Sequence, residues 1–233
     1  MTMTQKPFDF GVRIQRPGNP AGVPDQGHFC VCALAERAVT VFVDGAPRVL
    51  LPDYRPPPLK WQGSKASWGC ALSHRAAIQA AIAAGAKRAV IFEADAEPAQ
   101  PLAAIAATIQ AALDRLEARD PRWGALYLGG YFPNGSHQIP LGESHGSGLI
   151  QADAVMLAHA YALSATGLAA ALEVCDRAVS GQSLWPYGHI DVAFSTTLHS
   201  LCSIYVVDPW LFGQSEHISE LTGKLCKRSI AAV

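Results

Sequence analysis

The chain contains no apolar run that approaches the roughly 18 residues of a membrane-spanning helix. Its first residues, Met1 to Pro7, are polar and lack the apolar core of a secretory signal peptide. No segment repeats along the sequence, which argues against a repeat architecture. We therefore expect a cytoplasmic protein without a transmembrane segment.

Charged residues are also scarce, at 16% of 233 positions, and 18 basic against 19 acidic residues give a formal net charge of −1. General nucleic-acid binding needs a basic surface, so the composition excludes that partner and leaves room only for a local anion site. Hydrophobic residues make up 50% of the chain, which excludes disorder over most of its length. A chain of this size predicts one domain with a substantial core.

The six cysteines show no pattern of disulfides or metal ligands. Because there is no secretory signal and their neighbours are apolar, they are expected to be reduced thiols in the core. Cys30 and Cys32 are too close together, and have too few partner ligands, to suggest a zinc site. The six are Cys30, Cys32, Cys70, Cys175, Cys202 and Cys226.

Strand-like and helix-like segments alternate along the chain. Ser67 is a candidate N-cap for a central helix, and Gly85 is expected to end it. The first half predicts a strand at 8–14, a short helix at 29–37, a strand at 39–43 that completes a βαβ-like opening, the central helix at 69–84 and a strand at 89–92.

The second half continues the alternation and sets the expected fold class. An α/β fold with a mostly parallel sheet flanked by helices is the architecture that such a pattern predicts. The expected elements are a helix from Pro101 to Asp120, a strand at 126–128, a long polar loop at 129–148, a segment at 156–163 that leads into a helix at 164–179, a helix after Asp191 and a strand at 203–208.

Two acidic residues follow the apolar run Ala89 to Phe92. Glu93 and Asp95 are two positions apart, so both side chains point to the same side if strand geometry continues. Ligands of open α/β sheets gather outside the carboxyl ends of the strands. Two carboxylates at such an edge suit a hard divalent cation, and this pair is the best indication of function in the chain. The alternative is a polar strand end that faces water.

Two consecutive segments of the chain resemble glycosyltransferase family 25. They are Gly69-Cys70-Ala71-Leu72-Ser73-His74 and the strand that follows it, Val90-Ile91-Phe92-Glu93-Ala94-Asp95. That family includes lipopolysaccharide-type sugar transferases and the collagen galactosyltransferases. Its pattern is G-C-x-x-S-H, a helix, and an apolar strand that ends in Glu-Asp-Asp. Weaker matches follow in the same order, and the likeness spans residues 8–220. The weaker matches are Tyr127-Leu128-Gly129, His159-Ala160-Tyr161-Ala162-Leu163-Ser164, Ile190-Asp191 and Val206-Val207-Asp208-Pro209.

The resemblance implies a GT-A-like domain over residues 8–220, between a disordered N-terminus at 1–7 and a basic tail at 221–233. It implies an inverting hexosyltransferase that moves galactose or glucose from a UDP-sugar to a hydroxyl, with Mn²⁺ or Mg²⁺ as cofactor. The implied acceptor is a glycan or lipid-linked glycan of the bacterial surface, of the lipopolysaccharide type. Such an acceptor would bring the protein to the inner face of the membrane.

The resemblance also suggests which residues bind the metal and act as the base. Glu93 and Asp95 would be metal ligands, and His217 resembles the late histidine that GT-A-type transferases place on the metal. A surface histidine is the alternative. Asp191 would take the proton of the acceptor hydroxyl, and an N-cap is an equally good interpretation of this residue.

Donor binding is expected at four positions. Arg16 would meet the diphosphate with its fork of donors, although a solvated loop arginine fits the sequence nearly as well. Ser73 and His74 would lie beside the nucleotide together with Glu93. A structural role for His74, in which it packs against the sheet, is as well supported as ligand contact.

Two features favour other functions. Ala94 stands where the family has Asp, which weakens a cation cage and makes a non-catalytic nucleotide- or glycan-binding relative the second hypothesis. The segment Gly142-Glu143-Ser144-His145-Gly146 fits the nucleophile elbow of serine hydrolases, and Asp191 and His217 follow in suitable order. That elbow lies between a strand and a helix, whereas loop is predicted on both sides here. A hydrolase that uses Ser144 is therefore the third hypothesis.

Overall fold

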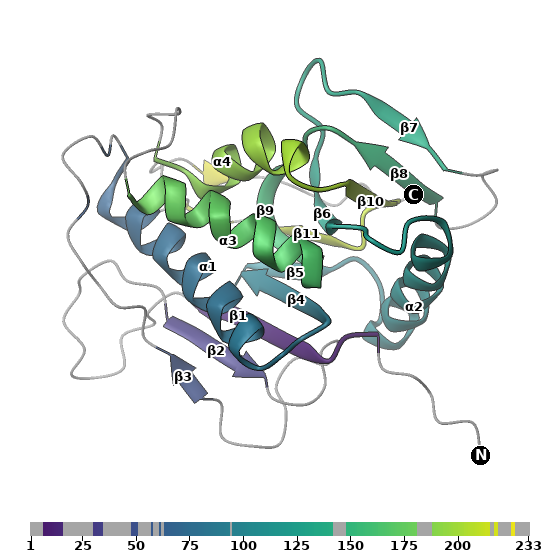
Figure 1. The fold of residues 1–233 in the computed structure, drawn as a ribbon, viewed down its shortest axis with the longest axis horizontal. Helices are drawn as coiled ribbons and strands as arrows, with labels where there is room; N and C mark the ends of the chain where they lie inside the picture. Colours follow the sequence, from purple (N-terminus) through teal and green to yellow (C-terminus); the bar gives the residue numbers. More distant parts are fainter. Residues whose placement is uncertain are drawn as a thin grey trace.

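The computed structural model describes residues 7–15, 30–34, 48–50, 57, 61, 63–93, 95–141, 148–180, 188–214, 217–218 and 225–226. Within these ranges a mixed sheet is flanked by helices, which confirms the α/β class (Figure 1). No helix of the described part is both long enough and apolar enough to cross a membrane.

Nine of the described strands form one sheet. From one edge to the other they are ordered β3-β2-β1-β4-β9-β6-β10-β8-β7. Their bounds are β1 Phe10–Gln15, β2 Cys30–Leu34, β3 Arg48–Leu50, β4 Arg88–Glu93, β6 Ala125–Tyr131, β7 Gln138–Pro140, β8 Gly148–Ala152, β9 Met156–Ser164 and β10 Ile204–Asp208.

The strand directions refine the prediction of a mostly parallel sheet. Six of the nine strands run one way, and β2, β9 and β8 run against them. The three reversed strands lie between the others, so only β1–β4 and β6–β10 are parallel neighbours. The decisive insertion is β9, which enters between β4 and β6 and is antiparallel to both. The sheet is therefore mixed.

Helices cover both faces of this sheet. In β4, Ile91 packs in a core that includes residues of three helices on one face, and Val90 packs against a fourth helix on the other. This is the alternation that strand geometry imposes. Figure 1 shows α1 and α3 side by side over one face, with α2 set apart from them. The helices are α1 Lys65–Ala83, α2 Leu102–Arg119, α3 Ala165–Val179 and α4 Ile190–Thr197, which continues into the 3-10 turn η1 Leu198–Ser200.

Several predicted helices agree with the structure. Gly85 follows α1 with a φ of 70°, a left-handed conformation that favours glycine. The side chain of Ser164 caps α3 by accepting a hydrogen bond from the Gly167 N–H. The apolar positions of α2 recur at helical spacing and are buried: Ile105, Ile109, Ala112, Leu113 and Leu116.

The opening of the chain is not the predicted βαβ unit. Residues 30–34 form β2, antiparallel to β1, where a short helix was expected. A short apolar run carries no decisive periodicity, so pairing with the edge of β1 decides its conformation. The strand expected at 39–43 lies outside the described residues.

Two further boundaries differ from the predictions. The N-cap of α1 is Ser64, whose side chain accepts a hydrogen bond from the Ser67 N–H at 3.1 Å, so Ser67 lies inside the helix. The expected loop at 129–148 begins later, because β6 continues to Tyr131, and it contains β7, which pairs with β8.

Two small sheets complete the described part. β5 (Ala96–Pro98) pairs with β11 (Phe212–Gln214), which brings the segment after β4 next to the segment after β10. β12 (His217–Ile218) pairs with β13 (Leu225–Cys226).

Candidate functional site

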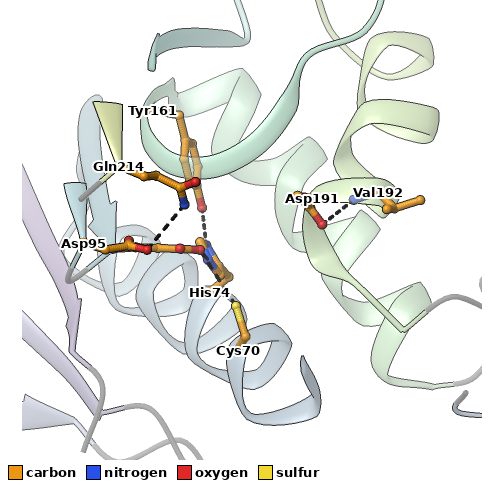
Figure 2. A network of polar contacts seen from close by, with 8 residues as sticks. Cys70, His74, Asp95, Tyr161, Asp191, Val192 and Gln214 are labelled. Atoms are coloured by element: carbon orange, nitrogen blue, oxygen red, sulfur yellow. Dashed lines mark hydrogen bonds and ion pairs between the residues drawn. The ribbon is translucent and has the colours of Figure 1, made fainter. Parts of the chain in front are cut away.

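A buried polar network lies at the carboxyl end of β4. Nε2 of His74 is 2.9 Å from Oε1 of Glu93, and Nδ1 of His74 is 2.7 Å from the hydroxyl of Tyr161. The thiol of Cys70 lies 3.8 Å from the same Glu93 oxygen. His74 is completely buried, and Glu93, at the edge of the network, keeps 22% of its side chain exposed. The network therefore connects the core with the surface of the site (Figure 2).

Three elements position these side chains. Cys70 and His74 are four residues apart in α1, so they lie one above the other on the same helix face. Tyr161 in β9 pairs directly with Ile91 in β4. Because side chains alternate along a strand, Glu93 emerges on the same face of the sheet as Ile91, next to the Tyr161 ring.

The protonation of this network follows from burial. Burial raises the pKa of the Tyr161 hydroxyl well above its usual range, so this group stays a donor. If Tyr161 donates to Nδ1 of His74, the other ring nitrogen carries the proton and donates to the Glu93 carboxylate. In that arrangement His74 orients the Glu93 carboxylate.

A cavity of about 70 Å³ borders this network and is called the site cavity below. Residues from five elements and from the segment before α4 line it, which shows that it is a product of the tertiary structure. Those central to its chemistry are Cys70, Glu93, Leu157, His189, Asp191 and Gln214.

Asp191 enters the site cavity from the first turn of α4. The N-cap of this helix is His189, so the N-cap interpretation of Asp191 does not hold. Its Oδ1 accepts a hydrogen bond from the Val192 N–H at 2.9 Å. Burial and the nearby charge of Glu93 raise the pKa of the Asp191 carboxyl, and His189 opposes that shift. A carboxyl group with a raised pKa beside a cavity is suited to proton transfer.

Asp95 is buried in the turn after β4, and its Oδ2 accepts a hydrogen bond from Nε2 of Gln214 at 3.4 Å. Burial, Glu93, Asp191 and Asp95, in that order, raise the pKa of the Cys70 thiol. Three carboxylates therefore disfavour the charged form of the same thiol. Figure 2 shows Asp95 and Gln214 beside the His74 network, and Asp191 on the separate turn that begins α4.

The backbone is strained where β9 passes the site cavity. Leu157 has a φ of 73°, in the left-handed region that branched apolar residues rarely adopt. The pairing of β6 with β9 shifts register in the same stretch. Bulges and residues of this kind occur at functional sites, where the surrounding structure holds a costly conformation.

The remaining predicted residues have different outcomes. Ser73 is completely buried and does not line the site cavity. Arg16, Ala94 and Ser144 lie outside the described residues, and of His217 the structure describes the backbone in β12 only.

Five residues of the site received no role from the sequence: Cys70, Tyr161, Leu157, His189 and Gln214. Cys70 belongs to the Gly69–His74 motif and Tyr161 to the His159–Ser164 motif. The four-residue spacing of Cys70 and His74 was a usable signal for Cys70. Leu157 and Gln214 carried no signal, because strand pairing and the β5–β11 contact bring them to the site cavity.

Comparisons with known proteins add little. No family model matches the chain, and no curated protein matches it. A solved structure, mannose-1-phosphate geranyltransferase from Thermus thermophilus, is 15% identical and has a TM-score of 0.32, over 68% of this chain and 51% of that chain. The present chain thus spans about half the length of that protein. At this TM-score the likeness bears on neither the fold family nor the activity.

Proposed function

We propose that the protein is a GT-A-type glycosyltransferase related to family 25, which moves a hexosyl group from a UDP-sugar to a hydroxyl acceptor. The observation that carries the proposal is the presence of Glu93 and Asp191 in the lining of the site cavity, with Asp95 buried in the turn directly after β4. The two segments of the fairly specific motif, the G-C-x-x-S-H helix and the acidic strand end, meet at this cavity. Packing alone does not require this concentration of carboxylates.

The leaving group of such a reaction is a nucleoside diphosphate, which gains negative charge as its bond to the sugar breaks. Glu93 and Asp95 are the described residues that would hold Mn²⁺ or Mg²⁺, since carboxylate oxygens suit hard cations. A bound cation supplies electrostatic stabilisation of the departing diphosphate. The hydrogen bonds from His74 to Glu93 and from Gln214 to Asp95 hold both carboxylates in place.

Asp191 is the proposed base. Its raised pKa makes it a better proton acceptor than an ordinary surface carboxylate, and it lines the site cavity. In an inverting transfer it would take the proton of the acceptor hydroxyl as that oxygen attacks the sugar. The proposed acceptor is a bacterial surface glycan or its lipid-linked precursor, met at the inner face of the membrane.

The serine hydrolase has little support from the fold. The segment 142–146 connects β7 with β8, two antiparallel neighbours in the sheet. A nucleophile elbow joins a strand to a helix instead. A non-catalytic relative that binds nucleotide or glycan is the second candidate, and the alanine at position 94 favours it.

Calorimetry with UDP, with and without Mn²⁺, tests the proposal. We expect UDP to bind and Mn²⁺ to tighten binding in the wild type, and Asp95→Asn to lose the effect of Mn²⁺. Asp153→Asn is the matched control, because Asp153 pairs with His137 in an exposed turn away from the site cavity. Absence of UDP binding at millimolar concentration would refute both the enzyme and the nucleotide-binding relative.

Donor hydrolysis separates these two candidates. A screen of UDP-hexoses should show Mn²⁺-dependent hydrolysis, and Asp191→Asn should lose about 10²–10⁴ of the transfer rate while retaining UDP binding, as removal of a general base does. UDP binding without turnover on any donor or acceptor tested would favour the non-catalytic relative.

A further inference from the structure

Three ligand atoms of different chemical type meet beside the site cavity. One ligand atom each of Cys70, His74 and Glu93 lie within 4.8 Å of one another. The imidazole and the carboxylate are 2.9 Å apart, and the thiol and the carboxylate are 3.8 Å apart. Tetrahedral zinc, with bonds of about 2.0–2.3 Å, places its ligands about 3.3–3.8 Å from one another. Small side-chain shifts therefore suffice to enclose an ion.

The surroundings hold the three ligands in position. Cys70 and His74 share one face of α1, so their relative position is set by the helix. The Tyr161 hydroxyl contacts the ring nitrogen of His74 that does not face Glu93. Metal-binding histidines typically make such an outer hydrogen bond, which fixes the orientation of the ring.

The donor set favours a metal different from that of the proposed transfer reaction. Thiolate and imidazole suit Zn²⁺, whereas Mg²⁺ and Mn²⁺ prefer oxygen ligands. Thiolate and carboxylate together would balance the two positive charges of the ion. We infer that Cys70, His74 and Glu93 form a site for a borderline-soft divalent cation of the Zn²⁺ class, with its fourth position open to the site cavity.

Proton balance is straightforward for this site. Binding releases the thiol proton of Cys70 to solvent, since the thiolate is the ligand. The imidazole of His74 keeps its single proton, which moves from Nε2 to Nδ1, so that Nε2 binds the ion and Nδ1 donates to the Tyr161 oxygen. Affinity should therefore rise with pH, with one proton released for each ion bound.

The inference does not depend on sugar transfer. It uses Cys70 and His74 as ligands, whereas the proposed hard-cation site uses neither as a ligand, and it requires no nucleotide. Glu93 belongs to both sites, so Zn²⁺ should compete with Mn²⁺ if the transfer proposal is also correct.

Titration of the metal-free full chain with Co²⁺, without nucleotide, tests the site. We expect one equivalent to bind with a thiolate-to-cobalt charge-transfer absorption that Zn²⁺ abolishes by displacement. Cys70→Ser should lose this absorption, and Tyr161→Phe should weaken Zn²⁺ binding about 10- to 100-fold, the usual effect of removing an outer hydrogen bond. Cys202→Ser is the control, because Cys202 is a half-buried thiol outside the cluster.

Circular dichroism establishes that each variant is folded before titration. If Cys70→Ser does not fold, Glu93→Gln replaces it, because the amide keeps the shape of the side chain but removes the charge. Charge-transfer absorption that persists in Cys70→Ser or disappears in Cys202→Ser overturns the assignment. So does Zn²⁺ affinity that is equal in the wild type and Glu93→Gln. Either result would leave the cluster as a hydrogen-bonded network that orients Glu93.

Discussion

Replacing Tyr161 with phenylalanine removes one oxygen from the centre of the buried network. The aromatic ring remains, with its stacked contact to His74 at 5.8 Å and its edge contact to Phe194 at 5.8 Å. The loss is therefore confined to the hydrogen bond with Nδ1 of His74, whose side chain is completely buried. A buried polar atom that loses its hydrogen bond costs about 1–3 kcal/mol of the free energy of unfolding.

This cost should be measurable by thermal unfolding. For a chain of this size each kcal/mol lowers Tm by about 2–4 °C, so the expected fall is about 2–12 °C. Tyr127→Phe is the matched control. The Tyr127 ring is also buried and packs 5.9 Å from Tyr161, but its hydroxyl makes no hydrogen bond with any other residue of the described part.

Circular dichroism melts, supported by urea titrations with unchanged m-values, provide the assay. The control should lose less than Tyr161→Phe, because it removes no hydrogen bond. Equal losses in the two variants, or no loss in Tyr161→Phe, would show that the bond between Tyr161 and His74 does not stabilise the folded protein.

Three further predictions concern packing, pH and the hydrolase alternative. Alanine suits a helix better than glycine by about 1 kcal/mol, but a Cβ at Gly167 would lie 2.0 Å from the backbone oxygen of Gly124. Gly167→Ala should therefore lower the free energy of unfolding in a urea titration. A gain in stability would contradict this packing. The pKa of the Asp191 carboxyl is raised in the folded state. At a pH above about 4 the folded protein therefore keeps the carboxyl proton that the unfolded chain has released, and stability falls as the pH rises further. Asp191→Asn should therefore raise Tm at neutral pH, with a gain that shrinks toward pH 4; an equal gain at both pH values would be inconsistent with the raised pKa. Ser144→Ala should leave donor hydrolysis unchanged, whereas a serine nucleophile would lose several orders of magnitude in rate.

The sequence by itself determined the elements whose signals are local. The helical spacing of Ile105, Ile109 and Leu113 marks α2, and Gly85 ends α1 because only its left-handed conformation fits there. The apolar run that ends in Glu93 marks β4 and its acidic edge. Each of these signals depends on residues within a few positions of one another, so backbone geometry alone turns the pattern into structure.

The tertiary structure alone decided the sheet order and the composition of the site. Whether residues 30–34 become strand or helix depends on the free edge of β1, which no local pattern encodes. Tyr161 meets His74 across 87 positions because β9 inserts between β4 and β6. Asp191 faces Glu93 because α4 packs at the end of that same face. These contacts arise from long-range pairing, whose free energy depends on the whole chain and not on the sequence around any one residue.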